Sequence, residues 1–80
     1  MNITSEACRS GRALLGWSMR DLAANAGVAV GTVNRLEGGA GEPWGATAAK
    51  IAAAFEAHGV ELVNDEDRTG AVLVYARRKG

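Results

Sequence analysis

A turn between two short amphipathic segments constrains this chain more than any other feature of its sequence. Apolar residues recur at three- and four-residue spacing on both sides of Gly27: Leu22, Ala23 and Ala26 before it, Val33 and Leu36 after it. Such spacing is typical of helices that bury one face. Glycine ends a helix at little cost because, without a Cβ, it easily adopts the left-handed conformation. The stretch Ser18–Glu37 is therefore predicted to form a helix, a tight turn at Gly27 with Val28 filling the corner, and a second helix.

Two further helices are predicted around this pair. Thr4 or Ser5 caps a first helix that runs to Leu15 or Gly16, and residues 1–4 form a short arm before it. Ser18 and Asp21 form a capping box at the start of the next helix. The helix over residues 30–37 has only Ala29 as its N-cap. After a glycine-rich loop, a helix over about residues 46–58 ends in a Schellman motif at Gly59. Its predicted buried stripe is Ala48, Ile51, Ala52 and Phe55.

The apolar period changes after Gly59. Val60–Val63 and Ala71–Tyr75 are rich in β-branched residues and are joined by the polar segment Asn64–Gly70, which predicts a β-hairpin. Both strands carry apolar residues on both faces, and a lone hairpin is marginal in water. We therefore predict a homodimer through the free face or the free edge of the hairpin. Its candidate dimerisation residues are Leu62, Val63, Val72, Leu73, Val74 and Tyr75.

The pattern around Gly27 resembles the helix-turn-helix of the phage-repressor/Cro-like (XRE) family of DNA-binding regulators. The resemblance covers about residues 7–60. It is carried by Leu22-Ala23, Ala26-Gly27-Val28, Val33 and Leu36-Glu37-Gly38, with Arg12–Ser18 upstream and Pro43 and the Ala-rich helix downstream. It implies a mainly α, four- to five-helix repressor-like domain with a C-terminal β-hairpin. We expect one domain over residues 1–80, with a helical part at about 5–59 and the hairpin and basic tail at about 60–80.

The resemblance implies that the helix over residues 30–37 enters the major groove of double-stranded DNA. The candidate base contacts are Val30, Gly31, Thr32, Asn34 and Arg35, and the candidate phosphate contacts are Arg12, Ser18, Met19, Arg20 and Gly39. Arg35 suits guanine, Asn34 suits adenine or a phosphate, and Val30 suits a thymine methyl group. Thr32 either bonds a phosphate or packs. Val30 and Gly31 stand where the family often has polar side chains, and Met19 stands where glutamine is common.

Several single residues leave open alternatives. The resemblance implies that Arg12 pairs with Glu37, whereas a solvated surface arginine is the plain alternative. Cys8 is read as a small core residue rather than a redox group. Gly11 either weakens its helix or admits a close neighbour. Trp17 is either a core residue or a hydrophobic staple. Trp44 is either a core residue or a phosphate-side contact, and the basic Arg77–Lys79 tail either follows DNA or is solvated.

The charge balance of the chain is unfavourable for binding to DNA. Nine basic residues match nine acidic ones, so the formal net charge is zero, although phosphate neutralisation supplies much of the affinity for DNA. We expect weak non-specific binding with a strong salt dependence. The zero charge and the apolar start of the helix at residue 30 also favour an alternative: a protein-interaction module, such as an antitoxin or a protein that sequesters another regulator.

Other functions lack the residues they need. One cysteine allows no internal disulfide. One histidine, one cysteine and no paired carboxylates give no nucleophile–base set, so an enzyme is not expected. We expect no cofactor and no metal. No apolar run is long enough to cross a membrane, and we expect a cytoplasmic protein whose partners include DNA, a second copy and either a regulatory protein or RNA polymerase.

Overall fold

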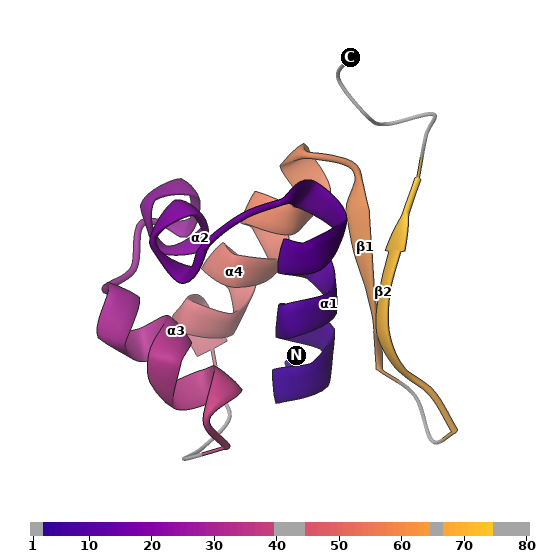
Figure 1. Ribbon diagram of the computed structural model, residues 1–80, viewed down its shortest axis with the longest axis horizontal. Coiled ribbons are helices and arrows are strands. Elements are labelled where there is room, and N and C mark those ends of the chain that lie inside the picture. The colour runs from indigo at the N-terminus through magenta and orange to yellow at the C-terminus, as the bar shows by residue number, and fades with distance from the viewer. Residues whose placement is uncertain (1–2, 40–44, 65–66, 75–80) are drawn as a thin grey trace.

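The computed structural model describes residues 3–39, 45–64 and 67–74. Within these residues, four helices precede a hairpin of two strands (Figure 1). The elements are α1 (Ser5–Leu15), α2 (Met19–Ala26), α3 (Val30–Glu37), α4 (Gly45–Ala57), β1 (Val60–Asn64) and β2 (Thr69–Leu73). The predicted mainly helical fold with a C-terminal β-hairpin is confirmed.

The ends of α1 follow local rules that the sequence already shows. The Thr4 hydroxyl accepts a hydrogen bond from the Ala7 N–H at 3.1 Å, so Thr4 rather than Ser5 is the N-cap. Gly16 ends the helix at φ 67°. The N–H groups of Gly16 and Trp17 donate to the carbonyl oxygens of Ala13 and Arg12, at 3.3 and 2.9 Å, which is the Schellman pattern.

The turn between α2 and α3 has the predicted geometry. Ser18 and Asp21 form the capping box, with reciprocal bonds of 3.0 and 2.9 Å. Gly27 lies in the left-handed region at φ 71°, and the Val28 N–H donates to the Ala23 carbonyl at 3.1 Å. Ala29 gives α3 no side-chain cap. Helix α3 therefore begins without the stabilisation that α1 and α2 receive.

Helix α4 differs slightly from its prediction. It begins and ends one residue early, at Gly45 and Ala57. Ala54 is buried, whereas Ala52, predicted in the buried stripe, is only half-buried. The stripe is wider than predicted because α4 packs against α2 on one side and β1 on another. Gly59 follows at φ 84° and its N–H donates to the Glu56 carbonyl, in keeping with the predicted stop.

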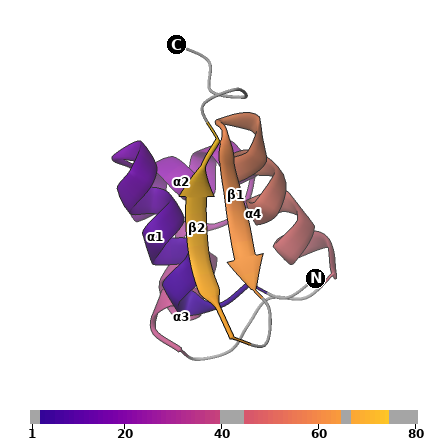
Figure 2. The same ribbon diagram turned by 90° about the vertical axis from the view of Figure 1, so that its right-hand side faces the viewer.

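The hairpin starts its second strand two residues earlier than predicted. Thr69 and Gly70, assigned to the turn by their polarity, pair with Asn64 and Val63. The antiparallel register places Val60 opposite Leu73 and Leu62 opposite Ala71. One face of the hairpin covers α1 and α4, and the other is turned outward (Figure 2). Tyr75, predicted to end the strand, lies outside the described residues, as do Pro43, Trp44 and the basic tail.

The core lies where the four helices and the hairpin meet. Its largest fully buried side chains are Phe55, Ile3, Leu22, Leu36, Ile51, Val33, Val60 and Cys8. Ile3 was predicted to lie in an arm, and this was wrong, because its side chain reaches the core before α1 begins. Gly11 admits a close neighbour: a Cβ there would lie 2.7 Å from Cε1 of Phe55. A side chain at position 11 would therefore have to displace the buried ring of Phe55.

Candidate nucleic-acid interface

Helices α2 and α3 pack against each other and lie on the side of the molecule opposite the hairpin (Figure 1). Val33, Leu36 and Glu37 are the buried residues of α3. The remaining side chains of α3 are exposed, except Thr32, which is half-buried. The turn at Gly27 thus orients α3 so that one side of the helix packs against the protein. The other side is exposed and can contact a large partner.

The exposed side of α3 holds four of the five candidate base contacts. Val30 and Asn34 are one pair at four-residue spacing, and Gly31 and Arg35 are another, so each pair shares a helix face. Val30 is 44% exposed, although it is a large aliphatic residue. No described atom lies within 4 Å of a Cβ built on Gly31. Thr32 is turned partly into the protein, which favours its packing role.

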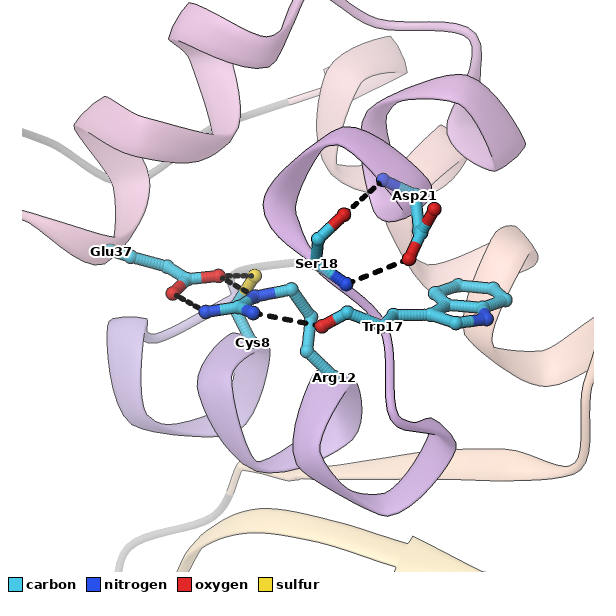
Figure 3. A network of polar contacts seen from close by, with 6 residues as sticks. All are labelled: Cys8, Arg12, Trp17, Ser18, Asp21 and Glu37. Atoms are coloured by element: carbon cyan, nitrogen blue, oxygen red, sulfur yellow. Dashed lines mark hydrogen bonds and ion pairs between the residues drawn. The ribbon is translucent and has the colours of Figure 1, made fainter.

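An ion pair ties the end of α3 to α1 (Figure 3). Arg12 Nε donates to Glu37 Oε2 and Arg12 Nη2 donates to Glu37 Oε1, each at 2.6 Å. The Glu37 side chain is only 3% exposed and that of Arg12 is 19% exposed. The predicted pair is confirmed. Its two parallel hydrogen bonds fix the orientation of the Arg12 guanidinium relative to the Glu37 carboxylate and thereby the position of the end of α3 on α1.

The same guanidinium also holds the connection between α1 and α2. Arg12 Nη1 donates to the Trp17 carbonyl oxygen at 2.9 Å, one residue before the N-cap of α2. One side chain therefore links α1, the entry to α2 and the last residue of α3. Arg12 uses three of its N–H donors within the protein. The contact of Arg12 with a DNA phosphate stays a prediction, and it would have to use the remaining N–H groups of the guanidinium.

Cys8 is a third member of this network. It is fully buried, as predicted, and its Sγ donates to Glu37 Oε2 at 3.2 Å. This bond was missed, because the thiol was read only as a small apolar group. The signal was available: Cys8 lies four residues before Arg12, on the same face of α1. Burial, then the bond to Glu37 and its charge, raises the pKa of the Cys8 thiol to about 12.

Glu37 keeps its negative charge despite being buried. Burial by itself would raise the pKa of this carboxyl group. The hydrogen bonds from Arg12 and Cys8 and the positive charge of Arg12 together outweigh burial, so the pKa of Glu37 lies below its ordinary value. The only acidic residue of α3 is thus ionised, neutralised by Arg12 and withdrawn from the exposed face.

The candidate phosphate contacts lie around the start of α2 and the end of α3. Arg20 and Gly39 are exposed, with Gly39 at φ 76°, and Met19 packs partly against the core. Ser18 is exposed, but its N–H and its hydroxyl oxygen are both bonded to Asp21. The exposed Asp21 carboxylate also lies in the first turn of α2. Arg20 is therefore the strongest phosphate candidate of this group.

Trp17 closes the gap between the α1–α2 connection and α4. Its ring stacks on Phe55 with a centroid distance of 5.9 Å and meets His58 edge-on at 4.8 Å. Core packing is thus the role of Trp17. The only histidine contacts an aromatic ring, and among the described residues no three His, Cys, Asp or Glu side chains gather as a metal site requires.

The candidate dimerisation residues fall into two sets. Leu62 and Leu73 pack against the core from the inner face of the hairpin, so they do not belong to an exposed surface. Val63 and Val72 lie on the outer face, where Val72 is 47% exposed. Val74 is half-buried, and its N–H donates to the Gly59 carbonyl at 2.6 Å. Val63 and Val72 therefore share the outer face of the hairpin with the exposed Glu61, which lies directly opposite Val72.

Comparison with known proteins agrees with this geometry. In the part of the chain that the structure describes, no helix is long and apolar enough to cross a membrane. A search of curated proteins returned no match to the chain. A family described as Helix-turn-helix matches residues 9–62, from the first half of α1 into β1. The chain therefore belongs to the XRE-type helix-turn-helix family and is a DNA-binding transcription regulator of that type.

Proposed function

We propose that the protein binds an inverted-repeat operator as a two-fold symmetric dimer and inserts α3 of each copy into the major groove. The observation that carries this is the chemistry of the exposed side of α3. It presents Val30, Asn34 and Arg35, while the carboxylate of Glu37 is buried and paired. No acidic group of α3 therefore opposes the approach of the base edges or the phosphates.

The exposed charges also differ in balance between the two sides of the molecule. Helices α2 and α3 expose Arg20 and Arg35 against Asp21, whereas the described part of the hairpin exposes Glu61 and Asp67 against Arg68. This arrangement supports DNA binding at zero net charge, because the field near α3 differs from that of the whole chain. We infer that Arg35 donates to guanine, Asn34 bonds adenine or a phosphate, and Arg20 holds a phosphate.

The outer face of the hairpin is the proposed dimer surface. Pairing between the β2 edges of two copies is disfavoured by the helices. A paired strand lies about 4.8 Å away, whereas packed helices need about 8–10 Å. Because α1 lies behind and outside β2 (Figure 2), two-fold edge pairing would bring the two copies of α1 into the same space. Packing of Val63 and Val72 against their counterparts avoids this clash.

Fluorescence anisotropy with the protein's own upstream DNA tests the proposal. We expect tight binding that survives competitor DNA and weakens steeply with salt, since each phosphate contact releases counterions. Arg35→Ala should weaken binding by a factor of about 5 to 150, the range for loss of a bidentate base contact. Lys50→Ala, an exposed cation on α4, is the matched control and should change binding far less.

A second candidate function is binding to another protein through the same surface. The exposed Val30 favours it, because an apolar side chain at the tip of α3 suits a protein partner. An antitoxin or a protein that sequesters a regulator would use α3 in this way, and RNA polymerase is a further candidate partner. No binding to upstream DNA at low salt would favour this function, and affinity capture with wild-type and Val30→Arg protein would then test it.

A further inference from the structure

We propose that Cys8 is a positioning residue for DNA binding: its thiol holds the Glu37 carboxylate and thereby fixes the end of α3 on α1. Cys8 acts through Glu37 and does not itself touch DNA. The inference rests on the proposed function, because it takes the exposed side of α3 as the surface that DNA contacts. It deepens that function by naming a buried residue of α1 on which the orientation of α3 depends.

Two successive turns of α1 hold the same carboxylate (Figure 3). Cys8 and Arg12 are four residues apart, so they lie on one face of α1. Arg12 bonds both carboxylate oxygens at 2.6 Å, and the Cys8 Sγ donates to Oε2 at 3.2 Å. The Arg12 side chain is long and can swing with the carboxylate that it holds, whereas only χ1 moves the Cys8 sulfur. The thiol therefore ties the end of α3 to a fixed point of the α1 backbone.

Burial makes the thiol difficult to replace. The Glu37 side chain is only 3% exposed and Cys8 is fully buried, so water has little access to the bond between them. A buried charged acceptor that loses a donor keeps its desolvation penalty without that compensation. Alanine or valine at position 8 would fill the core but would offer Glu37 no donor. The residue type at position 8 thus contributes to how α3 is held, beyond its contribution to packing.

Both groups have the protonation state that this bond requires. Burial, then the contact with Glu37, raises the pKa of the Cys8 thiol to about 12, so at neutral pH the thiol keeps its proton and is not a nucleophile. Burial also raises the pKa of Glu37, but the bonds from Arg12 and Cys8 and the positive charges of Arg12 and Arg9 outweigh it. Without the thiol, the pKa of Glu37 should rise. Proton uptake should then loosen α3 at a higher pH than in the wild type.

The end of α3 matters for DNA because Asn34 and Arg35 lie in its last turn. Both side chains are exposed, and both are proposed DNA contacts. Hydrogen bonds weaken steeply as their distance and angle depart from the optimum. A small rotation of this turn would therefore misplace both side chains at once. DNA affinity should thus depend on the Cys8 thiol, although the thiol is buried.

The first measurement follows Glu37 in the free protein. An NMR titration of its carboxyl group from pH 7 to pH 3 compares the wild type with Cys8→Ala, which removes the donor, and Cys8→Ser, which supplies one again. Cys8→Ala should titrate at higher pH than the wild type, and Cys8→Ser close to it. Ile51→Val, which removes a methyl group from the core on α4, should lose stability without changing this titration. Should Cys8→Ala fail to fold, Cys8→Val fills the position without a donor and takes its place.

The second measurement tests the effect on DNA binding. Anisotropy with a duplex that the wild-type protein selects from a random pool gives the affinity of each variant from pH 7 to pH 5. At pH 7, Cys8→Ala should bind about 2- to 12-fold more weakly, the range for loss of one hydrogen bond. The deficit should grow as the pH falls. Cys8→Ser should recover most of the affinity, and Ile51→Val should bind like the wild type.

Each outcome has a definite reading. The same Glu37 titration in wild type and Cys8→Ala would overturn the inference, as would a Cys8→Ser protein that behaves like Cys8→Ala. A shifted titration with unchanged DNA affinity at every pH would limit the bond to stability and would also overturn it. Failure of the wild type to select any duplex would instead contradict the proposed function. The titration of the free protein would then show separately whether the thiol holds Glu37, so the two failures are distinguishable.

Discussion

Three side chains set the position of α3 at the scale of single residues. Cys8 and Arg12 of α1 both donate to the carboxylate of Glu37, and Arg12 also holds the Trp17 carbonyl. The family resemblance predicted the Arg12–Glu37 pair, because both residues stand at positions where the family pairs them. It did not predict the bond from Cys8, because the thiol was taken as a small apolar group although Cys8 lies four residues before Arg12 on the same face of α1.

The ion pair should show strong coupling in a double-mutant cycle. Arg12→Met leaves the buried carboxylate of Glu37 without its cation, and removal of one partner of a buried pair costs about 3–5 kcal/mol. Glu37→Leu removes the other partner. We expect the double variant to lose clearly less unfolding free energy than the sum of the single losses in urea denaturation. Additive losses would mean that the two groups act independently.

Acid should weaken the protein through Glu37. Its pKa is lowered in the folded state, so the unfolded chain binds the proton more readily. The stabilisation is therefore complete above the unfolded pKa of about 4.3 and is lost as the pH falls towards the lower folded value. Urea denaturation from pH 7 to pH 3 should show this loss. It should be smaller in Glu37→Gln but not in Glu56→Gln, which changes an exposed residue of α4.

At the scale of elements, the signals that were read correctly are local. The Thr4 and Ser18 caps and the glycines at 16 and 27 act within a few residues, so their sequence patterns suffice. The errors arose where distant contacts decide. Thr69 joins β2 because Asn64 pairs with it, and Ile3 is buried because the core reaches beyond the end of α1. Neither contact is visible in a short stretch of sequence.

Two glycines in helices should respond oppositely to the same substitution. Alanine normally favours a helix by about 1 kcal/mol over glycine. Gly31→Ala meets open space among the described atoms, so it should stabilise the protein by about 0.5–1 kcal/mol. Gly11→Ala places a Cβ 2.7 Å from the ring of the buried Phe55 and should destabilise it by about 1–3 kcal/mol. Thermal denaturation measures both changes in stability. A Gly11→Ala protein as stable as the wild type would show that the Phe55 ring can move to make room for the Cβ.

At the scale of the whole molecule, the hairpin is both part of the core and the proposed dimer surface. Its two-sided apolar pattern already predicted that both faces need partners. Only the strand register shows which residues lie on which face. Leu62 and Leu73 face the helices, whereas Val72 faces outward. Removal of residues 60–80 would also remove the buried Val60. Substitution on the outer face is therefore the informative test of dimerisation.

Val72→Arg should convert the dimer to a monomer without unfolding it. The side chain is 47% exposed in the single chain, so arginine costs the monomer little, but in the dimer a long charged side chain would replace the apolar contact between the two copies. Sedimentation equilibrium should show half the wild-type mass, with the melting temperature compared at matched dilution. Ala53→Arg, an exposed position on α4, is the control. A Val72→Arg protein that remains dimeric would place the dimer surface elsewhere.

The dimer surface also limits the spacing of the operator half-sites. Helix α3 and the hairpin lie towards opposite ends of the longest dimension of the molecule, which is 33 Å (Figure 1). A dimer joined through the outer hairpin faces therefore holds its two α3 helices much farther apart than one joined near α3. Half-sites on one face of DNA lie roughly 34–36 Å apart or at multiples of this distance. In a series of duplexes with half-site spacing increased one base pair at a time, affinity should peak at whole turns. The two-turn peak should be the higher for the hairpin dimer. A single optimum at one turn would contradict this arrangement and would indicate a dimer surface closer to α3.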